Sequence, residues 1–169
     1  MRAPVSAYIG LGANLHDPAA QLRSALAELA QLPDTRVTAR SRFYLSKPLG
    51  PKDQPDYLNA VAALETRLDP PELMRHLLAI EAQHGRQRSP DGRWGARSLD
   101  LDLLMYGALA LQTRELTLPH PELHKRSFVL YPLAELAPDL VIPGHGPVRV
   151  LREHCRSPAI RLYEEGAHA

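Results

Sequence analysis

A chain of 169 residues is long enough to bury one hydrophobic core, and its 44% hydrophobic and 23% charged residues are usual for a soluble globular protein. The net charge of +1 does not favour bulk nucleic-acid binding, and the single cysteine excludes an internal disulfide framework. No apolar stretch is long enough to cross a bilayer or to act as a signal peptide. We therefore expect one domain over residues 1–169 and a cytoplasmic location.

The first elements are predicted to be a strand, a helix and a second strand. Residues 6–12 form a short apolar run that ends at a glycine, which is typical of a strand. Residues 17–32 carry leucines at helical spacing, with Asp17 as the N-cap and a proline directly after it. Residues 35–46 alternate apolar and polar side chains, which predicts one strand with a shared face formed by Val37, Ala39, Ser41 and Phe43.

The middle of the chain is predicted to hold a second strand–helix–strand unit. Prolines and a glycine interrupt residues 47–55, so this segment is neither helix nor central strand. A strand follows over residues 57–66, then a helix over 69–85 with Asp69 as its N-cap, and then a strand over 99–107. Farther on, the sequence predicts a hairpin, a helix and a short tail helix, at residues 108–119, 127–138 and 148–155.

This order of elements is the βαββαβ arrangement of an α+β fold. It predicts a ferredoxin-like sandwich with an additional C-terminal hairpin and helices. The helices would cover one face of the sheet and leave the other face open.

Asp100 and Asp102 stand two residues apart in the strand over 99–107. Residues i and i+2 of a strand point to the same face and lie about 6–7 Å apart at Cα. Leu99, Leu101 and Leu103 would then point into the helices, and the two acids away from them. Two carboxylates this close repel each other, and a shared divalent cation would relieve the repulsion. A solvated outer face explains the pair equally well, because a D-x-D pattern alone is a weak signal.

An arginine-rich loop directly precedes the two acids, and it contains Arg86, Arg88, Arg93 and Arg97. Guanidinium groups match phosphate oxygens, and Mg²⁺ bound by one or two carboxylates keeps substrate phosphates among its other ligands. Arginines beside a carboxylate pair therefore favour a polyphosphate–magnesium site over a solvated basic loop.

The segment GRQRSPDGRWGARSLDLDLLMYG, residues 85–107, resembles the signature of the 6-hydroxymethyl-7,8-dihydropterin pyrophosphokinase family of folate biosynthesis. Further similarity to the family runs through YIGLGANL, PLGPKDQPDYLNAV and LPHPELHKRSFVLYPLAEL, at residues 8–15, 48–61 and 118–136. The resemblance implies the ferredoxin-like fold and an ATP-dependent diphosphotransferase. Such an enzyme transfers the terminal diphosphate of ATP to the hydroxymethyl group of the pterin and releases AMP.

The resemblance also implies which residues bind the phosphates. Asp100 and Asp102 would hold two Mg²⁺ ions, and the catalytic residues would be these acids together with Arg86, Arg88 and Arg97. ATP would contact these three arginines and, in addition, Glu81, Trp94, Leu103, His120 and Arg126.

The pterin half of the site can be argued from side-chain chemistry as well. A flat polar ring favours an aromatic stacking face and an amide that can donate and accept hydrogen bonds. Tyr57, Asn59 and Phe128 match the family's pterin pocket, although aromatic side chains also serve in a core. By the same resemblance, the backbone of Ser46, Pro48 and Leu49 would line the edge of the ring, and Trp94 would close over it.

Two other functions are left open by the residues alone. A non-catalytic ferredoxin-like RNA-binding module needs stacking aromatics on its sheet, where this sequence has acids. A nucleotidyltransferase with a two-acid metal site would release diphosphate instead of AMP. Ala96 stands where the family usually has proline, and the roles of Arg93 and Arg114 stay open.

The partners that the resemblance implies are small molecules, namely ATP and 6-hydroxymethyl-7,8-dihydropterin. No nucleic acid and no membrane is expected. We expect a monomer, although the sequence does not determine the oligomeric state.

Overall fold

The computed structural model describes residues 3–15, 17–47, 55–85 and 99–164. The first part of the chain forms β1 (Val5–Ala13), α1 (Pro18–Ala30), β2 (Thr35–Arg40), β3 (Tyr44–Ser46), β4 (Tyr57–Thr66), α2 (Pro70–Gln83) and β5 (Asp100–Tyr106). The second part adds β6 (Leu111–Gln112), β7 (Thr117–Leu118), the 3₁₀ helix η1 (Leu123–Lys125), α3 (Ser127–Leu136), β8 (Val141–Ile142), β9 (Gly146–Pro147), α4 (Val148–His154) and β10 (Arg161–Leu162).

The main sheet is antiparallel throughout. Its strands follow the order β10-β3-β4-β1-β5, and β2 pairs with β4 as well. The central pair is β1 with β4, whose register runs from Val5 opposite Thr66 to Ala13 opposite Leu58. Among the described residues, the fold is thus a mixed α/β arrangement with an antiparallel main sheet and four α-helices.

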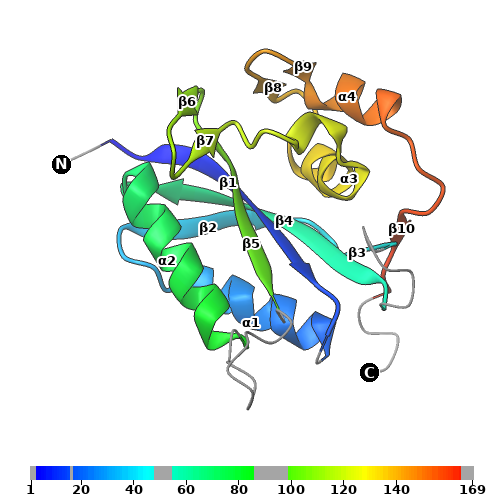
Figure 1. Cartoon of the computed structure of the whole chain (residues 1–169), viewed down its shortest axis with the longest axis horizontal. Coiled ribbons are helices and arrows are strands. Elements are labelled where there is room, and N and C mark those ends of the chain that lie inside the picture. The colour runs from blue at the N-terminus through cyan, green and yellow to red at the C-terminus, as the bar shows by residue number, and fades with distance from the viewer. Residues whose placement is uncertain (1–2, 16, 48–54, 86–98, 165–169) are drawn as a thin grey trace.

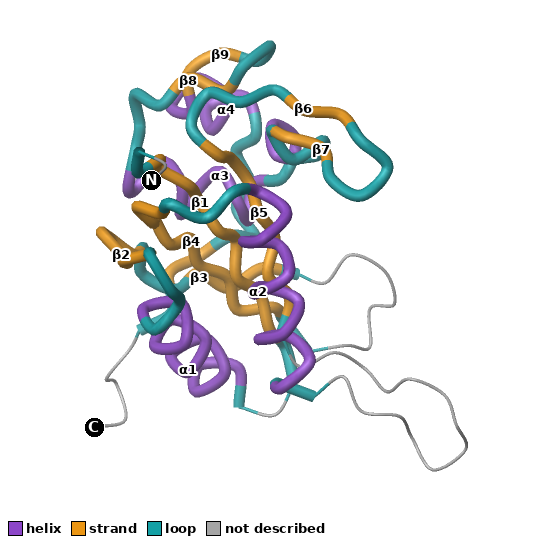
Figure 2. The backbone as a smooth tube through the Cα atoms, turned by 90° about the vertical axis from the view of Figure 1, so that its left-hand side faces the viewer, coloured by secondary structure: helices purple, strands orange, loops and turns teal. Residues whose placement is uncertain are grey.

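The helices α1 and α2 pack against one face of the main sheet (Figures 1 and 2). The core on this side is built from alternate residues of the strands and from one apolar face of each helix. Its buried members include Ile9, Leu11, Leu22, Leu29, Leu73, Leu77, Leu101 and Leu103. The alternation predicted for the start of β5 and the helical spacing predicted for α1 and α2 are therefore confirmed.

The helix α3 covers part of the opposite face, and α4 packs against α3 (Figure 2). A second buried cluster lies here, formed by Val61, Leu104, Met105, Leu123, Val129, Leu130, Leu133, Ile142 and Val148. The expectation of an open second face is thus correct only for the part that α3 leaves uncovered. In the described part of the chain, no helix has the length and apolar character that crossing a membrane requires.

Both predicted helix caps are present. The Asp17 side chain accepts a hydrogen bond from the backbone N–H of Ala20, at 3.3 Å. Asp69 and Glu72 form a reciprocal capping box, with bonds of 2.8 and 3.1 Å between each side chain and the other residue's N–H. These bonds satisfy N–H groups that have no partner within the helix, which is why each helix begins where it does.

The prediction of one continuous strand over 35–46 is wrong. A register shift between Val37 and Ala39 bulges β2, and Ala39 is exposed. The strand then breaks after Arg40, because the Ser41 hydroxyl accepts a hydrogen bond from the N–H of Val61 at 2.9 Å. The Ser41 N–H still donates to the Val61 carbonyl at 2.8 Å, so a side chain replaces the backbone acceptor of the Val61 N–H alone, and regular strand pairing with β4 resumes at β3.

Candidate active site

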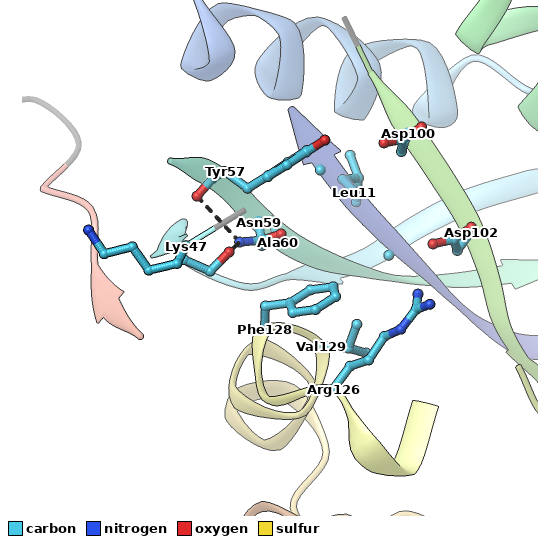
Figure 3. Close-up of a pocket in the computed structure, with 13 residues that line it drawn as sticks. Leu11, Lys47, Tyr57, Asn59, Ala60, Asp100, Asp102, Arg126, Phe128 and Val129 are labelled. Atoms are coloured by element: carbon cyan, nitrogen blue, oxygen red, sulfur yellow. Dashed lines mark hydrogen bonds between the residues drawn. The ribbon is translucent and has the colours of Figure 1, made fainter. Parts of the chain in front are cut away.

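A cavity of about 200 Å³ lies between the start of α3 and the sheet face that α3 leaves uncovered. Strands β1, β3, β4 and β5 and the residues at the start of α3 all contribute to its wall (Figure 3). The cavity brings together many of the residues that the sequence predicted for one site, namely Ser46, Tyr57, Asn59, Asp100, Asp102, Arg126 and Phe128.

Asp100 and Asp102 enter the cavity because β5 alternates. Leu101 and Leu103 are buried in the core beneath α1 and α2, and the two acids are half-buried on the opposite face. In the pairing of β1 with β5, Gly12 lies opposite Asp100 and Gly10 lies opposite Asp102. Cross-strand side chains normally pack within about 5 Å of each other, so neither acid has a side chain directly opposite it on β1.

Farther along β5, a bulge ends the alternation. Tyr8 pairs with Met105 but Ile9 pairs with Leu103, so Leu104 is the extra residue of β5. The side chains of Leu104 and Met105 both join the cluster beneath α3. The carbonyl of Leu104 accepts a hydrogen bond from the N–H of His120 at 2.9 Å, which ties the His120 segment to the strand that carries the acids.

Glu81 supports the same strand from the side of α2. It is 5% exposed, and its Oε2 atom accepts a hydrogen bond from the N–H of Leu101 at 2.7 Å. A buried N–H on a terminal strand needs an acceptor outside the sheet ladder, and Glu81 supplies it. The bond joins the last turn of α2 to the start of β5, directly between the two acids in sequence.

His120 is held as a neutral ring. Its Nδ1 atom accepts a hydrogen bond from the N–H of Glu122 at 3.2 Å, so the proton of the neutral ring lies on Nε2. Burial lowers the pKa of His120 from its usual value, and the positive charge of Arg126 lowers it further, whereas the charges of Asp102 and Glu122 act in the opposite direction. Near neutral pH, His120 therefore offers an N–H donor without a charge.

Arg126 points toward the acids. Its guanidinium lies over the ring of Phe128, 5.7 Å from the centroid, and Figure 3 shows the side chain reaching from the start of α3 toward Asp102. A cation over an aromatic face is attracted by the ring, which limits the directions that the arginine can take. Among the described residues, this part of the cavity brings the Arg126 guanidinium close to the carboxylates of Asp100 and Asp102.

At the other end of the cavity, two aromatic side chains face each other across an open slot. Figure 3 shows Tyr57 and Phe128 on opposite sides of a space whose floor is formed by β1 and β4, with Asn59 at its edge. Partial burial raises the pKa of Tyr57, and the negative charge of Asp100 raises it further, so the phenol stays protonated. The aromatic faces and the carboxylates thus open into one space.

Comparison with known proteins gives this geometry its context. The family model of 7,8-dihydro-6-hydroxymethylpterin-pyrophosphokinase (HPPK) matches residues 8–138. The chain belongs to this family. The 2-amino-4-hydroxy-6-hydroxymethyldihydropteridine pyrophosphokinase of Haemophilus influenzae is 52% identical over 140 residues, which are 83% of this chain and 86% of the relative. The protein of the same name from Pseudomonas aeruginosa is 51% identical over 136 residues, which are 80% and 83% of the two chains.

A solved HPPK structure shares the fold. The wild-type HPPK-DHPS of Plasmodium falciparum, crystallised with pteroate, superposes with a TM-score of 0.71 at 13% sequence identity. The match covers 91% of this chain and 43% of that one, so this chain spans less than half of the solved protein's length. At this identity, the comparison concerns the fold alone.

Some residues predicted for the HPPK site lie elsewhere. The side chain of Leu103 is 3% exposed in the core beneath the helices, which leaves only its backbone for a nucleotide contact. His120 lies beside the main cavity and lines a neighbouring one. The predictions for Pro48, Leu49, Arg86, Arg88, Trp94 and Arg97 fall outside the described residues.

Other cavity residues were missed by the sequence analysis. These are Gly10, Leu11, Gly12, Lys47, Ala60 and Val129. The glycines had a usable signal, because two glycines at i and i+2 in a strand leave one face bare, and a strand interior disfavours glycine unless something approaches closely. Lys47 and Val129 had none, since their position depends on how β3 and α3 pack on the sheet.

The residues present suit a hard divalent cation whose remaining ligands come from elsewhere. In the part of the chain that is described, no group of three or more His, Cys, Asp or Glu side chains could hold a metal. Two carboxylates beside bare glycines are instead the donor set that Mg²⁺ takes when waters and substrate phosphates complete its coordination. In an HPPK-family site, these donors would be Asp100 and Asp102.

Proposed function

We propose that this chain transfers the diphosphate of ATP to the hydroxymethyl group of 6-hydroxymethyl-7,8-dihydropterin, with release of AMP, in folate biosynthesis. One observation carries the proposal beyond family membership. The ring slot and the carboxylate pair open into the same cavity, so a flat heterocycle and a polyphosphate would meet there.

The proposed phosphate end comprises Asp100, Asp102, His120 and Arg126. Asp100 and Asp102 would hold two Mg²⁺ ions, which would neutralise phosphate charge and lower the pKa of the substrate hydroxyl. The Nε2–H of His120 would donate a hydrogen bond to a phosphate oxygen, and Arg126 would pair with a phosphate. Arg86, Arg88 and Arg97 would provide further cations, and Glu81, Trp94 and Leu103 further nucleotide contacts, as the family signature suggests.

The proposed pterin end comprises Tyr57, Phe128 and Asn59. The two rings would stack on opposite faces of the heterocycle, and Asn59 would bind its polar edge. Ser46, Pro48 and Leu49 would line that edge, and Trp94 would cover it.

The reaction needs positioning and charge neutralisation more than covalent catalysis. The hydroxymethyl oxygen forms a bond to the β-phosphorus of ATP, and the bond from this phosphorus to the oxygen shared with the α-phosphate breaks, so AMP leaves. The hydroxyl proton passes to Asp100 or Asp102. Arg126 and His120 hold the phosphates in line for attack by donating to their oxygens.

We also propose that the fold is ferredoxin-like and that residues 1–169 act as one pyrophosphokinase domain. The order β5-β1-β4-β2, all antiparallel and with α1 and α2 on one face, supports the first proposal. We also predict that the protein is a monomer, that it is located in the cytoplasm, and that neither nucleic acid nor a membrane is among its partners.

Product analysis tests the proposed function. The protein is incubated with ATP, Mg²⁺ and the reduced hydroxymethylpterin, and the nucleotides are separated by chromatography. We expect AMP and the diphosphorylated pterin in equal amounts, and no turnover when the pterin is omitted or when EDTA is in excess. Stoichiometric ADP would contradict the proposal, and release of inorganic diphosphate would instead indicate a nucleotidyltransferase.

A further inference from the structure

The amide nitrogen of Asn59 is surrounded by oxygen atoms. Asn59 lies on β4 and is 5% exposed. Its Nδ2 atom donates to Ser46 Oγ at 2.7 Å and to the carbonyl of Tyr44 at 3.3 Å, and the carbonyl of Tyr57 is 3.4 Å away. Two of these three acceptors are main-chain carbonyls, which cannot donate.

This setting fixes which end of the amide faces the cavity. If the amide were turned over, Oδ1 would face the carbonyls of Tyr44 and Tyr57, and bonds to a buried group would be lost. The hydrogen bond to Ser46 is the shortest of the three, and it is the one that a side-chain substitution can remove. Ser46 and Asn59 therefore act as a unit.

Gly12 leaves the oxygen of Asn59 accessible. A Cβ atom at Gly12 would lie 3.5 Å from Asn59 Oδ1, which is ordinary van der Waals contact. Gly12 is not among the glycines with positive φ, so its backbone would accept alanine. Glycine is unfavourable inside a strand compared with alanine, yet here it leaves open the space in front of an acceptor.

We propose that Ser46 is a positioning residue, which fixes the Asn59 amide so that the slot presents a hydrogen-bond acceptor and selects rings with an N–H donor at that edge. This inference rests on the proposed function. A reduced pterin carries an amide-like N–H and an amino group on its pyrimidinone ring, and both are donors. A ring methylated at this N–H offers no donor there and would cover Asn59 Oδ1 without giving it a partner.

Paired binding measurements test this. The Kd values of the reduced hydroxymethylpterin and of its analogue methylated at the ring N–H are measured by titration for the wild type, Ser46→Ala and Ser46→Thr. We expect Ser46→Ala to weaken pterin binding about 3–10-fold, as for one lost hydrogen bond. The preference for the pterin, measured as the Kd of the analogue divided by the Kd of the pterin, should decrease. The loss should fall on the KM for pterin rather than on kcat or on the KM for ATP, and Ser46→Thr should restore the preference.

Gly12→Ala tests the same acceptor without touching Ser46. Its added methyl group lies in front of Asn59 Oδ1 and should also lower the ratio of the analogue Kd to the pterin Kd. The thermal midpoint should stay the same or rise. Gly10→Ala is the matched control, because its Cβ would contact the side chain of Leu104 and not Asn59. It should leave the ratio of the two Kd values unchanged.

The outcomes separate this inference from the proposed function. If the wild type releases AMP but Ser46→Ala and Gly12→Ala keep the full preference, the positioning role is wrong and the proposed function stands. A Ser46→Ala protein in which both KM values, kcat and the thermal midpoint all worsen would show that Ser46 is only structural. A wild type that neither binds the pterin nor releases AMP would overturn both proposals.

Discussion

The two ends of strand β5 have opposite surroundings on the same face of the sheet. At one end, Leu104 and Met105 are buried beneath α3 in an apolar cluster. At the other end, Asp100 and Asp102 face a cavity, with only glycines opposite them on β1. The change occurs within a few residues, where the bulge at Leu104 also anchors His120.

One strand thus combines a packed apolar end with an acidic end that lines a cavity. Apolar burial stabilises the fold at one end, whereas like charges oppose it at the other. Two carboxylates about 6 Å apart, at an effective dielectric constant near 20, repel by roughly 2–3 kcal/mol before screening by water and salt. Such a pair is expected where function, not folding, requires it.

The largest effect should come from removing one charge at the cavity end. Asp100→Asn or Asp102→Asn keeps the side-chain shape but removes a ligand for the cation, so we expect turnover to fall by about 10²-fold or more, as when a key electrostatic group is lost. Steady-state release of AMP measures this. Asp139→Asn is the control, because that side chain is 88% exposed and pairs only at the surface with Arg149. If Asp100→Asn or Asp102→Asn has turnover near that of the control, the proposed role of that acid in the reaction is wrong.

A change on the helix side of β5 should have the converse effect. Leu103→Ala removes buried methyl groups from the core and should cost about 2–5 kcal/mol in the free energy of unfolding. At a temperature where the variant is folded, kcat should stay near that of the wild type. Leu78→Ala is the matched control, since Leu78 is 46% exposed on α2 and should cost little. Denaturant unfolding with equal costs at both leucines would contradict the assigned core.

Glu81 ties α2 to the acid-bearing end of β5, and its replacement should give an intermediate effect. Glu81→Ala leaves the buried N–H of Leu101 without this acceptor, which should cost about 1–3 kcal/mol of stability. Glu81→Gln retains an acceptor oxygen and should cost less. Gln83→Ala, on an exposed position of the same helix, serves as the control. An unfolding free energy that stays the same in Glu81→Ala would show that Glu81 does not support β5, whatever the effect on the KM for ATP.

The smallest expected effect is on the pH dependence of stability, and it comes from His124, next to Leu123 of the apolar cluster beneath α3. The ring of His124 stacks on that of His145 with centroids 3.7 Å apart, and its buried Nδ1 has no hydrogen-bond partner within the described residues. Burial lowers the pKa of His124, and the charges of His145 and Lys125 lower it further. The unfolded chain therefore binds this proton more readily, so stability should decrease as the pH falls below about 6.5.

Melts at pH 7.5 and pH 5.5 measure this contribution. His124→Gln should lose less stability between the two pH values than the wild type does, and His154→Gln, at an exposed position, should match the wild type. A His124→Gln protein with the same pH dependence as the wild type would exclude this linkage.

Local patterns in the sequence predicted much of this fold. The alternation in β5 and the caps at Asp17 and Asp69 follow from contacts within a few residues, and each was confirmed. The break between β2 and β3 was not predictable, because it depends on a bond from Val61 to the Ser41 hydroxyl across the sheet. The alternation of apolar and polar residues gives no sign that a side chain replaces a backbone hydrogen-bond acceptor.

The candidate site divides in the same way. The acids and the side chains proposed to bind the ring were predicted from residue chemistry and family signature, and the structure brings them to one cavity. The support of Leu101 by Glu81 and the fixed amide of Asn59 were not predicted, since each depends on a tertiary hydrogen bond. The arginines before β5 stay a prediction from the signature.

The most direct test of why Asp100 and Asp102 share a face is a thermal melt of the wild type and of Asp102→Asn, each in EDTA and in Mg²⁺ with a non-hydrolysable ATP analogue. If the pair is there to hold a cation, the variant should be as stable as the wild type or more stable in EDTA, because the repulsion is gone. The Mg²⁺–nucleotide mixture should then raise the melting temperature of the wild type more than that of the variant. A variant that is clearly less stable in EDTA, and that gains as much from Mg²⁺ and nucleotide as the wild type, would show that the acids serve the fold and would contradict this account.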